Sequence, residues 1–226
     1  PAGTVLIADS QTGGRGRLGR SFHSPAGSGI YMSVILRPNC PPQNLMHLTC
    51  AAAVAMCYAV ENATGYRPGI KWTNDLVFGK KKVGGILTEL GFGPGGTVSY
   101  AIVGIGINCT QSEKDFPKEI RDIAGSLAMV TGKEIDRAAV AAHMIQAMHN
   151  MNLTLQSFKE EILDTYRRDC ITLGKAVSLV RADGEVHHGT ALDIDENGAL
   201  IVEYSSGCRE IVNSGEVSVR GMYGYL

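Results

Sequence analysis

The chain has 226 residues, enough for one sizeable hydrophobic core or for one core with a small second domain. Hydrophobic residues make up 44% and charged residues 19%, the ordinary balance of a soluble globular protein. With 21 basic and 22 acidic side chains the formal net charge is −1, which argues against a dedicated nucleic-acid binder, since such proteins are normally basic.

Charge is unevenly distributed along the chain. Residues 1–82 hold nine basic and three acidic side chains, a net of +6, whereas the remainder holds 12 and 19, a net of −7. A basic, glycine-rich first third indicates that an anionic ligand is handled there, although chance segregation of charge would give the same pattern.

Apolar alternation predicts five strands in the first half of the chain: Thr4–Ala8, Ile30–Leu36, Ile70–Trp72, Lys82–Leu90 and Val98–Ile107. The last two are joined by a Gly-Pro-Gly-Gly turn at residues 93–96, which predicts an antiparallel hairpin. A helix is predicted over Gln43–Asn62, ending at Gly65. Its apolar run Leu45–Val60 is too short to span a bilayer, so we expect a buried core helix.

From Ile120 to Asp169 the pattern is helical, and Asp136 is positioned to cap a helix over Arg137–Met151. After Thr172 short alternating runs are separated by Asp-Gly, Asn-Gly and Ser-Gly turns. Five such strands in about fifty residues are typical of a small antiparallel barrel. We therefore expect a larger domain over residues 1–172 and a small barrel over residues 173–226.

The six cysteines form no CxxC pair and lie at no metal-binding spacing from histidine. Cys50 and Cys57 are seven residues apart in the alanine-rich helix, so they share a face and pack as small apolar side chains. We interpret all six as reduced thiols of a cytoplasmic protein, and no signal peptide is visible.

The strongest local signal is the segment Gln11–Arg20, with the sequence QTGGRGRLGR. Its four glycines let the backbone approach a ligand and leave amides to hydrogen-bond anionic oxygens. Arg15, Arg17 and Arg20 add guanidinium groups suited to carboxylate and phosphate. A flexible basic surface loop is the alternative, but arginines interleaved with glycines directly after a strand favour a ligand-binding loop.

Two further segments carry candidate lysines. Lys71 lies in one predicted strand and Lys82 begins the next, so both ammonium groups can face one cleft and neutralise a carboxylate and a phosphate that approach each other. We interpret Lys80 and Lys81 as solvated charges at a hairpin tip. The pair Asn74–Asp75 either borders the cleft or forms an Asx turn that caps the hairpin, and both roles are compatible.

The segment Val103–Cys109 (VGIGINC) places two glycines inside a predicted strand. Glycine weakens a strand unless another group must approach its face, so the pattern favours a close contact there. By itself the motif is weak, since a helix that crosses a sheet would explain it as well.

Together these motifs closely resemble those of the biotin protein ligase family. The family pattern GRGRxGR matches Gly14–Arg20, KWPND matches Lys71–Asp75, KxxGIL matches Lys82–Leu87, and GxGIN matches Gly104–Asn108. The resemblance covers essentially the whole chain. It implies an α+β fold: a class II synthetase-like biotin/lipoate ligase domain, with a mixed or antiparallel sheet and helices, followed by a small SH3-like barrel.

The resemblance also implies an activity. ATP, with Mg²⁺, would adenylate biotin to biotinyl-5′-AMP, and biotin would then pass to a specific lysine of a biotin carboxyl carrier protein. The implied catalytic residues are Lys82, Arg17 and Asp75. The implied biotin contacts are Gln11, Arg15, Gly16, Arg17, Lys82, Gly85, Leu87 and Gly104. The implied adenylate contacts are Arg15, Arg20, Phe22, Lys71, Asn74 and Asn108.

The segment Gln11–Arg20, here called the glycine-arginine loop, is expected to order over the ligand. Lys82 is expected to contact both the biotin carboxylate and the α-phosphate. We expect no protein metal site and no membrane association, and either a monomer or a homodimer.

Three departures from the family pattern stand out. Phe22 occupies the position where the family usually has tryptophan, so the ring still stacks but lacks the indole N–H. Thr73 replaces the proline of KWPND, a change we expect to affect only loop stiffness. The family's Ser-Thr-Asn segment, which grips the biotin ureido group, does not occur in these residues. Because the chain begins at Pro1, without Met, we expect upstream residues to supply it.

Two alternatives remain at this point. A lipoate or octanoate transferase resembles the family in its catalytic sheet but is not expected to carry the Gly14–Arg20 motif or the C-terminal barrel. A transcription repressor is an alternative of another class, because some family members carry an N-terminal winged helix. No such DNA-binding domain occurs in these residues.

Overall fold

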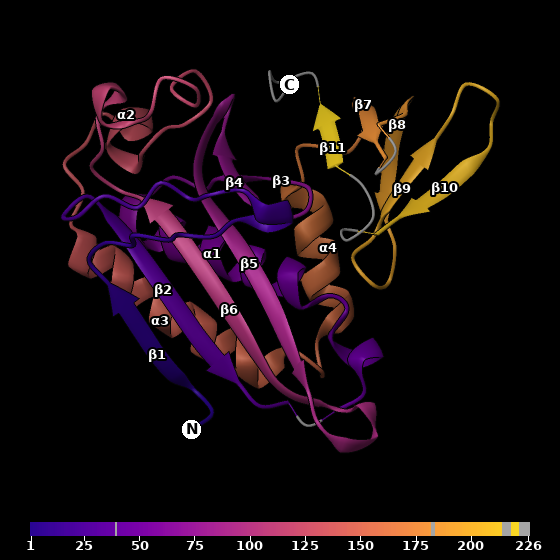
Figure 1. The fold of residues 1–226 in the computed structure, drawn as a ribbon, viewed down its shortest axis with the longest axis horizontal. Helices are drawn as coiled ribbons and strands as arrows, with labels where there is room; N and C mark the ends of the chain where they lie inside the picture. The colour runs from indigo at the N-terminus through magenta and orange to yellow at the C-terminus, as the bar shows by residue number, and fades with distance from the viewer. Residues whose placement is uncertain (39, 182–183, 214–217, 222–226) are drawn as a thin grey trace.

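The computed structural model describes residues 1–38, 40–181, 184–213 and 218–221, and it has the expected α+β class (Figure 1). A six-stranded sheet with strand order β1-β2-β6-β5-β4-β3 occupies the first half of the chain. Each pair of neighbouring strands in it is antiparallel. Its strands are β1 (Thr4–Ala8), β2 (Gly29–Leu36), β3 (Gly69–Lys71), β4 (Asp75–Phe78), β5 (Lys81–Phe92) and β6 (Val98–Asn108).

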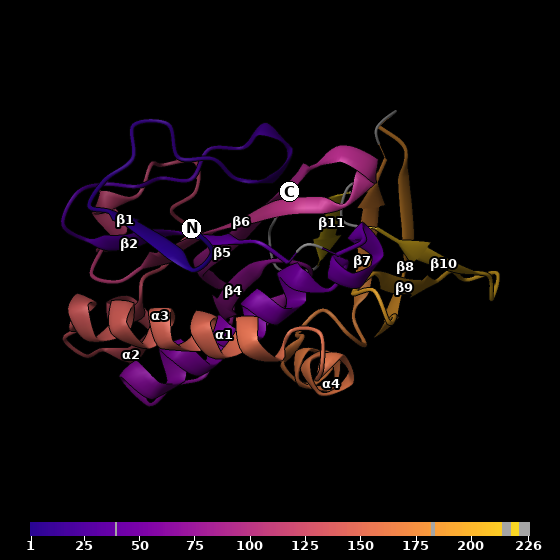
Figure 2. The ribbon, with the colours of Figure 1, turned by 90° about the horizontal axis from the view of Figure 1, so that it is seen from below.

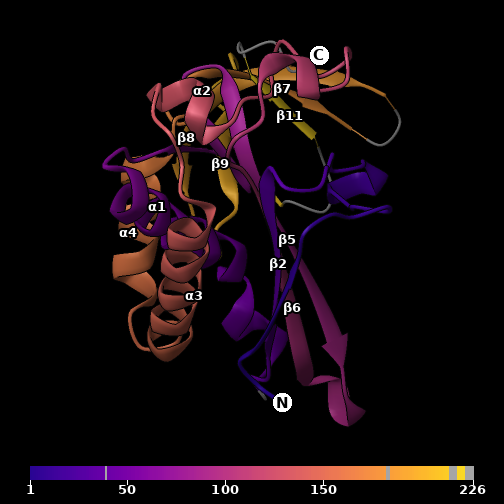
Figure 3. The same cartoon turned by 90° about the vertical axis from the view of Figure 1, so that its left-hand side faces the viewer.

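Helices cover one face of this sheet, and the glycine-arginine loop lies on the other, as Figures 2 and 3 show. The two long helices pack against each other and against the sheet. The helices are α1 (Leu48–Thr64), α2 (Leu127–Thr131), α3 (Arg137–Thr154) and α4 (Lys159–Asp169). The open face of the sheet is therefore available for a ligand site.

The helix α1 is the centre of the core. Its run of small apolar residues is almost fully buried, including Cys50 and Cys57, which pack as predicted. Helix α1 and the 3-10 turn before it together span Pro42–Thr64, which is 23 residues. By length and composition this stretch is apolar enough to cross a membrane, whereas the sequence analysis expected its apolar run to be too short. Since 72% of its apolar window is buried inside the protein, it is a core helix.

The cysteines are unpaired thiols. Five are buried, and burial raises the pKa of the Cys50 and Cys109 thiols to about 12. Cys208 is exposed. At neutral pH the buried thiols are therefore protonated and behave as small apolar groups, as the sequence predicts.

The second sheet has five antiparallel strands, as predicted for the C-terminal region, in the order β10-β9-β8-β7-β11. They are β7 (Ala176–Val180), β8 (Val186–Ile194), β9 (Leu200–Glu203), β10 (Arg209–Val212) and β11 (Ser218–Gly221). This small sheet is consistent with an SH3-like fold. Val217, which starts the last predicted strand, and Asp183 of a predicted turn lie outside the described residues. The division of domains at residue 172 stays a prediction.

One short strand escaped the sequence prediction, and one short helix was predicted only as part of the longer helical stretch Ile120–Asp169. The four-residue strand β4 follows directly on Asn74, a residue type that favours turns, so local composition masked it. The five-residue helix α2 begins at an N-cap, Ser126, and ends at Gly132 in the left-handed conformation, which separates it from α3. Elements this short depend on tertiary contacts more than on periodicity.

The predicted N-cap of α3 is confirmed, and its removal should weaken the fold. The Asp136 carboxylate accepts hydrogen bonds from the Ala138 and Ala139 amides at 2.8 and 3.1 Å. We expect Asp136→Ala to lower the free energy of unfolding by about 1 kcal/mol, measured by urea denaturation. Glu134→Ala, at an exposed position just before the helix, is the control and should change it by less than about 0.5 kcal/mol.

Candidate active site

One cavity of about 620 Å³ lies against the large sheet beneath the loop that joins β1 and β2. Its volume is in the range of sites for small molecules and cofactors. All of the residues singled out from the sequence line this cavity: Gln11, Arg15, Gly16, Arg17, Arg20, Phe22, Lys71, Asn74, Asp75, Lys82, Gly85, Leu87, Gly104 and Asn108. The structure thus brings together segments more than ninety positions apart in the chain.

Strands β5 and β6 form the floor of the cavity, and successive side chains along each strand face opposite sides of the sheet. Residues that face the helices, such as Ala101 and Val103, are buried in the core. Their neighbours face the opposite side and line the cavity, among them Leu87, Glu89 and Gly104. Glu89 was missed by the sequence reasoning, yet it lies two positions beyond Leu87, so the period of two along a strand could have identified it.

The strand glycines leave space that side chains of the site occupy. A Cβ at Gly106 would lie 2.4 Å from the Phe22 ring, so the aromatic ring rests directly on the bare strand, which is the close contact that the glycine pattern predicted. A Cβ at Gly85 would lie 3.3 Å from the Lys82 Nζ atom. Glycine at these two positions therefore lets the aromatic ring and the ammonium group lie close to the sheet.

The lysine singled out in β5 is held by a carboxylate from the neighbouring strand. The Nζ atom of Lys82 lies 2.5 Å from Oδ1 of Asp75 in β4, and both side chains are largely shielded from solvent. Lys71 ends β3, so β4 lies between the two lysine-bearing strands, whereas the sequence reasoning placed these strands in direct succession. Both lysines nevertheless line the same cavity.

Asn74 links the loop to the sheet and does not cap a turn. Its side-chain amide donates to the Ile86 carbonyl at 2.7 Å, and its oxygen accepts from NH1 of Arg17 at 3.1 Å. The hydrogen-bond partners of this side chain lie 12 and 57 residues away in the sequence. The interpretation of Asn74 as an Asx-turn residue is therefore wrong. Only the folded chain brings these partners together.

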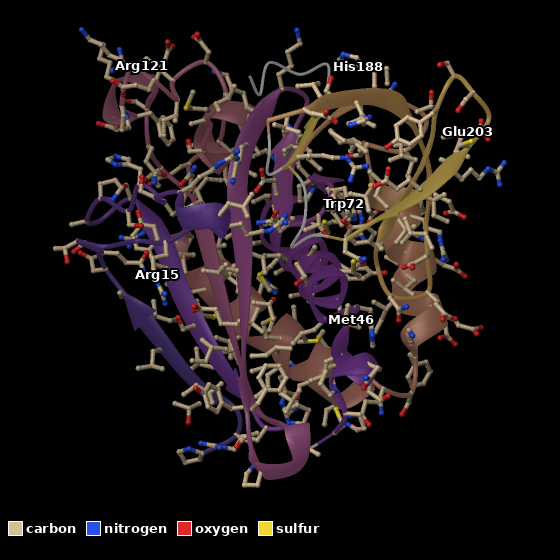
Figure 4. The ribbon with its side chains drawn as sticks, turned by 45° about the vertical axis from the view of Figure 1, so that its right-hand side comes forward. Arg15, Met46, Trp72, Arg121, His188 and Glu203 are labelled. Carbon is tan, nitrogen blue, oxygen red and sulfur yellow. The ribbon has the colours of Figure 1, made fainter. Side chains whose placement is uncertain are left out.

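The glycine-arginine loop is tied to the sheet by a few polar contacts. Arg17 reaches Asn74, and Arg15 pairs with Glu89 at 3.1 Å in an exposed ion pair (Figure 4 labels Arg15). Exposed pairs of this kind contribute little stability. Burial lowers the pKa of the Arg17 guanidinium, which stays charged at neutral pH. Ordering of the loop on ligand binding stays a prediction.

Lys71 is the most deeply buried of the cavity's cations, with 7% of its surface exposed. Its pKa is lowered to about 8, chiefly by burial; the nearby charges of Lys82 and Arg20 contribute to this shift, while Asp75 opposes it. Of the lysines assigned to the hairpin tip, Lys80 is exposed as expected. Lys81 is not solvated as expected, because its ammonium group donates to the Arg121 carbonyl at 3.0 Å.

Comparison with known proteins places this site in a family. The sequence profile of the biotin/lipoate A/B protein ligase family matches residues 1–108, and that of the biotin protein ligase C terminal domain matches residues 172–220. The biotin--[acetyl-CoA-carboxylase] ligase of Paracoccus denitrificans is 31% identical over an alignment that covers 96% of this chain and 90% of that protein. The chain belongs to the biotin protein ligase family.

Solved structures and a longer relative support the same assignment. Biotin protein ligase from Aquifex aeolicus in complex with biotin and ATP matches with a TM-score of 0.83 and 34% identity, over 98% of this chain and 90% of that one. The bifunctional ligase/repressor BirA of Bacillus subtilis is 38% identical over 95% of this chain. The chain spans 66% of the length of that relative.

Two departures from the biotin protein ligase pattern have a visible structural setting. Phe22, in place of tryptophan, rests on Gly106 and meets Tyr31 edge to face, with ring centroids 6.4 Å apart. Thr73, in place of proline, is buried, and its carbonyl accepts a hydrogen bond from the Tyr166 hydroxyl at 2.9 Å. Both positions are therefore packed against the rest of the protein.

The electrostatic setting of Lys71 leads to a titration prediction. Since its pKa lies near 8, the ammonium charge should be present at pH 7 and lost as the pH rises through that value. Removing the Asp75 charge with Asp75→Asn should move the transition to lower pH, because that carboxylate favours the charged form. NMR titration of the Lys71 side chain would measure the shift. Glu113→Gln, at an exposed position outside the cavity lining, should leave the transition unchanged.

Proposed function

We propose that this chain adenylates biotin with ATP and transfers the biotinyl group to a lysine of a carrier protein. The observation that carries the proposal is one cavity that is lined by residues from all four family motifs singled out above. Cationic side chains and a glycine-lined strand floor meet there. Those are the two features that an activated carboxylate needs: neutralisation of charge and close approach of the backbone.

In the first step the biotin carboxylate attacks the α-phosphate of ATP and releases pyrophosphate. Both reactants are anionic, so their approach requires positive charge between them. Lys82 is the residue we assign to this position, supported by Asp75, which holds its ammonium group over Gly85 before the ligand arrives. Lys71 and Asn74, on the same wall, would border the adenylate.

We assign the glycine-bearing strand face to biotin and the Phe22 side to the nucleotide. Gly104 adds no side chain to the floor, where a Cβ would meet only ordinary contacts from Leu87, so its absence leaves room for a ring system. Mg²⁺ enters with ATP, as part of that substrate. Among the described residues no group of three or more His, Cys, Asp or Glu side chains could hold a metal ion.

In the second step a carrier lysine attacks the mixed anhydride, forms the amide and releases AMP. Water would hydrolyse the same anhydride, so the loop over the cavity has to exclude it. Arg17 is suited to this closing role, because it spans from the loop to Asn74 on the sheet. We place the activity in the cytoplasm, where the unpaired thiols of this chain would stay reduced.

The direct test is ATP–pyrophosphate exchange. The proposal expects exchange that depends on added biotin, and a thermal shift with biotin but not with lipoate. Exchange driven by lipoate or octanoate would instead support the related transferase activity. Transfer is then tested with a biotin carboxyl carrier protein and a variant in which its acceptor lysine is replaced by arginine.

Lys82 should dominate the adenylation step. Replacing it with alanine removes the charge between the two anions, and we expect a cost of about 2.7–4 kcal/mol, by analogy with the loss of one oxyanion donor. Lys80→Ala, at the exposed turn two residues earlier, should leave the exchange rate nearly unchanged. Equal exchange rates in the two variants would mean that the reaction depends on another lysine.

Arg17→Gly should separate formation of the intermediate from its retention. The substitution removes the contact to Asn74 but leaves Lys82 and Asp75 in place, so adenylation should continue. A charge-assisted hydrogen bond contributes about 1.5–3 kcal/mol, so biotinyl-AMP should escape roughly ten- to a hundredfold faster. The released anhydride would then acylate unrelated lysines. Blotting an unrelated lysine-rich protein for biotin measures this, and labelling confined to the carrier would contradict the closing role.

A further inference from the structure

A turn of the small C-terminal sheet contacts the middle of the Lys71–Asp75 segment. The indole Nε1 of Trp72 donates to the Gly198 carbonyl at 3.0 Å, across 126 positions of sequence. Trp72 is 5% exposed and lies where the small sheet meets the large domain (Figure 4). On either side of it are Lys71 and Asn74, whose side chains line the cavity.

The turn that presents this carbonyl is closed by its own hydrogen bonds. The Asp195 carboxylate accepts from the amides of Asn197 and Ala199, both at 2.8 Å, and the Gly198 amide donates to the Asp195 carbonyl. Gly198 itself has a φ of +84°, which a glycine adopts without strain. The acceptor is therefore held in one orientation by the β8–β9 turn.

The same turn is seated on the large domain from two directions. Arg167 of α4 donates twice to the Ile194 carbonyl at the end of β8, at 3.1 and 2.8 Å. On the other side, a Cβ at Gly198 would lie 2.7 Å from the Cys50 Sγ atom of α1. The glycine is therefore required by packing as well as by its backbone angle.

Two further hydrogen bonds to the backbone of the segment also come from residues outside the cavity lining. The Trp72 amide donates to Thr172 Oγ1 at 2.9 Å, and the Tyr166 hydroxyl donates to the Thr73 carbonyl. These bonds hold the backbone, whereas the indole bond is the one that orients the Trp72 side chain. Because that bond ends on the small sheet, the position of the sheet is transmitted to the cavity wall.

We propose that Gly198 and Trp72 form a positioning contact through which the C-terminal sheet sets the geometry of Lys71 and Asn74 for the adenylation step. The inference rests on the proposed function. It makes Gly198, which is outside the cavity, a determinant of turnover. Loss of the contact should lower kcat of ATP–pyrophosphate exchange and leave the KM for biotin nearly unchanged, because the biotin side of the cavity is formed by β5 and β6.

The chain offers a matched pair of variants to test this. Gly198 and Gly207 both lie in turns of the small sheet, with φ of +84° and +80°. Alanine at either position has the same backbone strain, but at Gly207 a Cβ would meet nothing within 4 Å. We expect Gly198→Ala to lower kcat about tenfold or more, as loss of a buried hydrogen-bond partner would, and Gly207→Ala to change it less than about twofold.

Two further variants separate positioning from misfolding. Trp72→Phe removes only the indole donor and should lower kcat about tenfold with the biotin KM within about twofold. In the double variant Gly198→Ala/Cys50→Ala, removal of the Cys50 Sγ atom leaves space for the methyl group at position 198. Part of the lost kcat should therefore return, and Cys50→Ala alone is the control. Rescue of this kind would not follow from a general loss of stability.

Trp72 is the sole tryptophan of the chain, so its fluorescence reports the contact directly. Gly198→Ala should shift the emission to longer wavelength as water reaches the indole, and Gly207→Ala should not. Equal kcat and emission in these two variants, beside an active unaltered chain, would overturn the positioning inference alone. Absence of biotin-dependent exchange in the unaltered chain would instead overturn the proposed function.

Discussion

Positive charge concentrated in one cavity is the constraint on which the rest of this structure depends. Lys71, Lys82 and the loop arginines line one cavity of about 620 Å³, where their like charges repel one another. The lowered pKa of Lys71 records mainly the free-energy cost of burying its charge, with smaller contributions from the charges of Lys82 and Arg20. Asp75 compensates for part of it by holding Lys82 at 2.5 Å, and Glu89 does the same for Arg15.

The antiparallel sheet makes such a site possible because its two faces have opposite character. Alternation along β5 and β6 directs large apolar side chains toward α1 and α3, which exclude water from that side. The other face is left with glycines and a few polar groups, and the loop that follows β1 covers it.

The segment Lys71–Asp75 is where a turn of the small sheet meets the wall of the candidate site. It carries Lys71, Asn74 and Asp75, and its backbone is held by α4 and by Thr172 just beyond that helix. The turn at Gly198 adds a contact from the small sheet. In a family defined by both a ligase domain and a C-terminal domain, this contact gives the second domain a physical route to the first.

Local chemistry in the sequence determined much of the fold and identified the main cations of the candidate site, and the family resemblance named further lining residues. Turn residues and apolar periodicity located the long strands, the core helix and the cap at Asp136, because these depend on neighbouring residues. Arginine and lysine among glycines identified the cavity's cations, since few other settings need both charge and a bare backbone.

Tertiary structure alone decided which groups are partners. The strand β4, the bond from Arg17 to Asn74 and the bond from Trp72 to Gly198 join residues that local sequence does not relate. Glu89 likewise acquires a role only when β5 turns that side chain toward the loop. Hydrogen bonds and ion pairs act over a few ångströms, and distances of that size between remote residues exist only after the chain has folded.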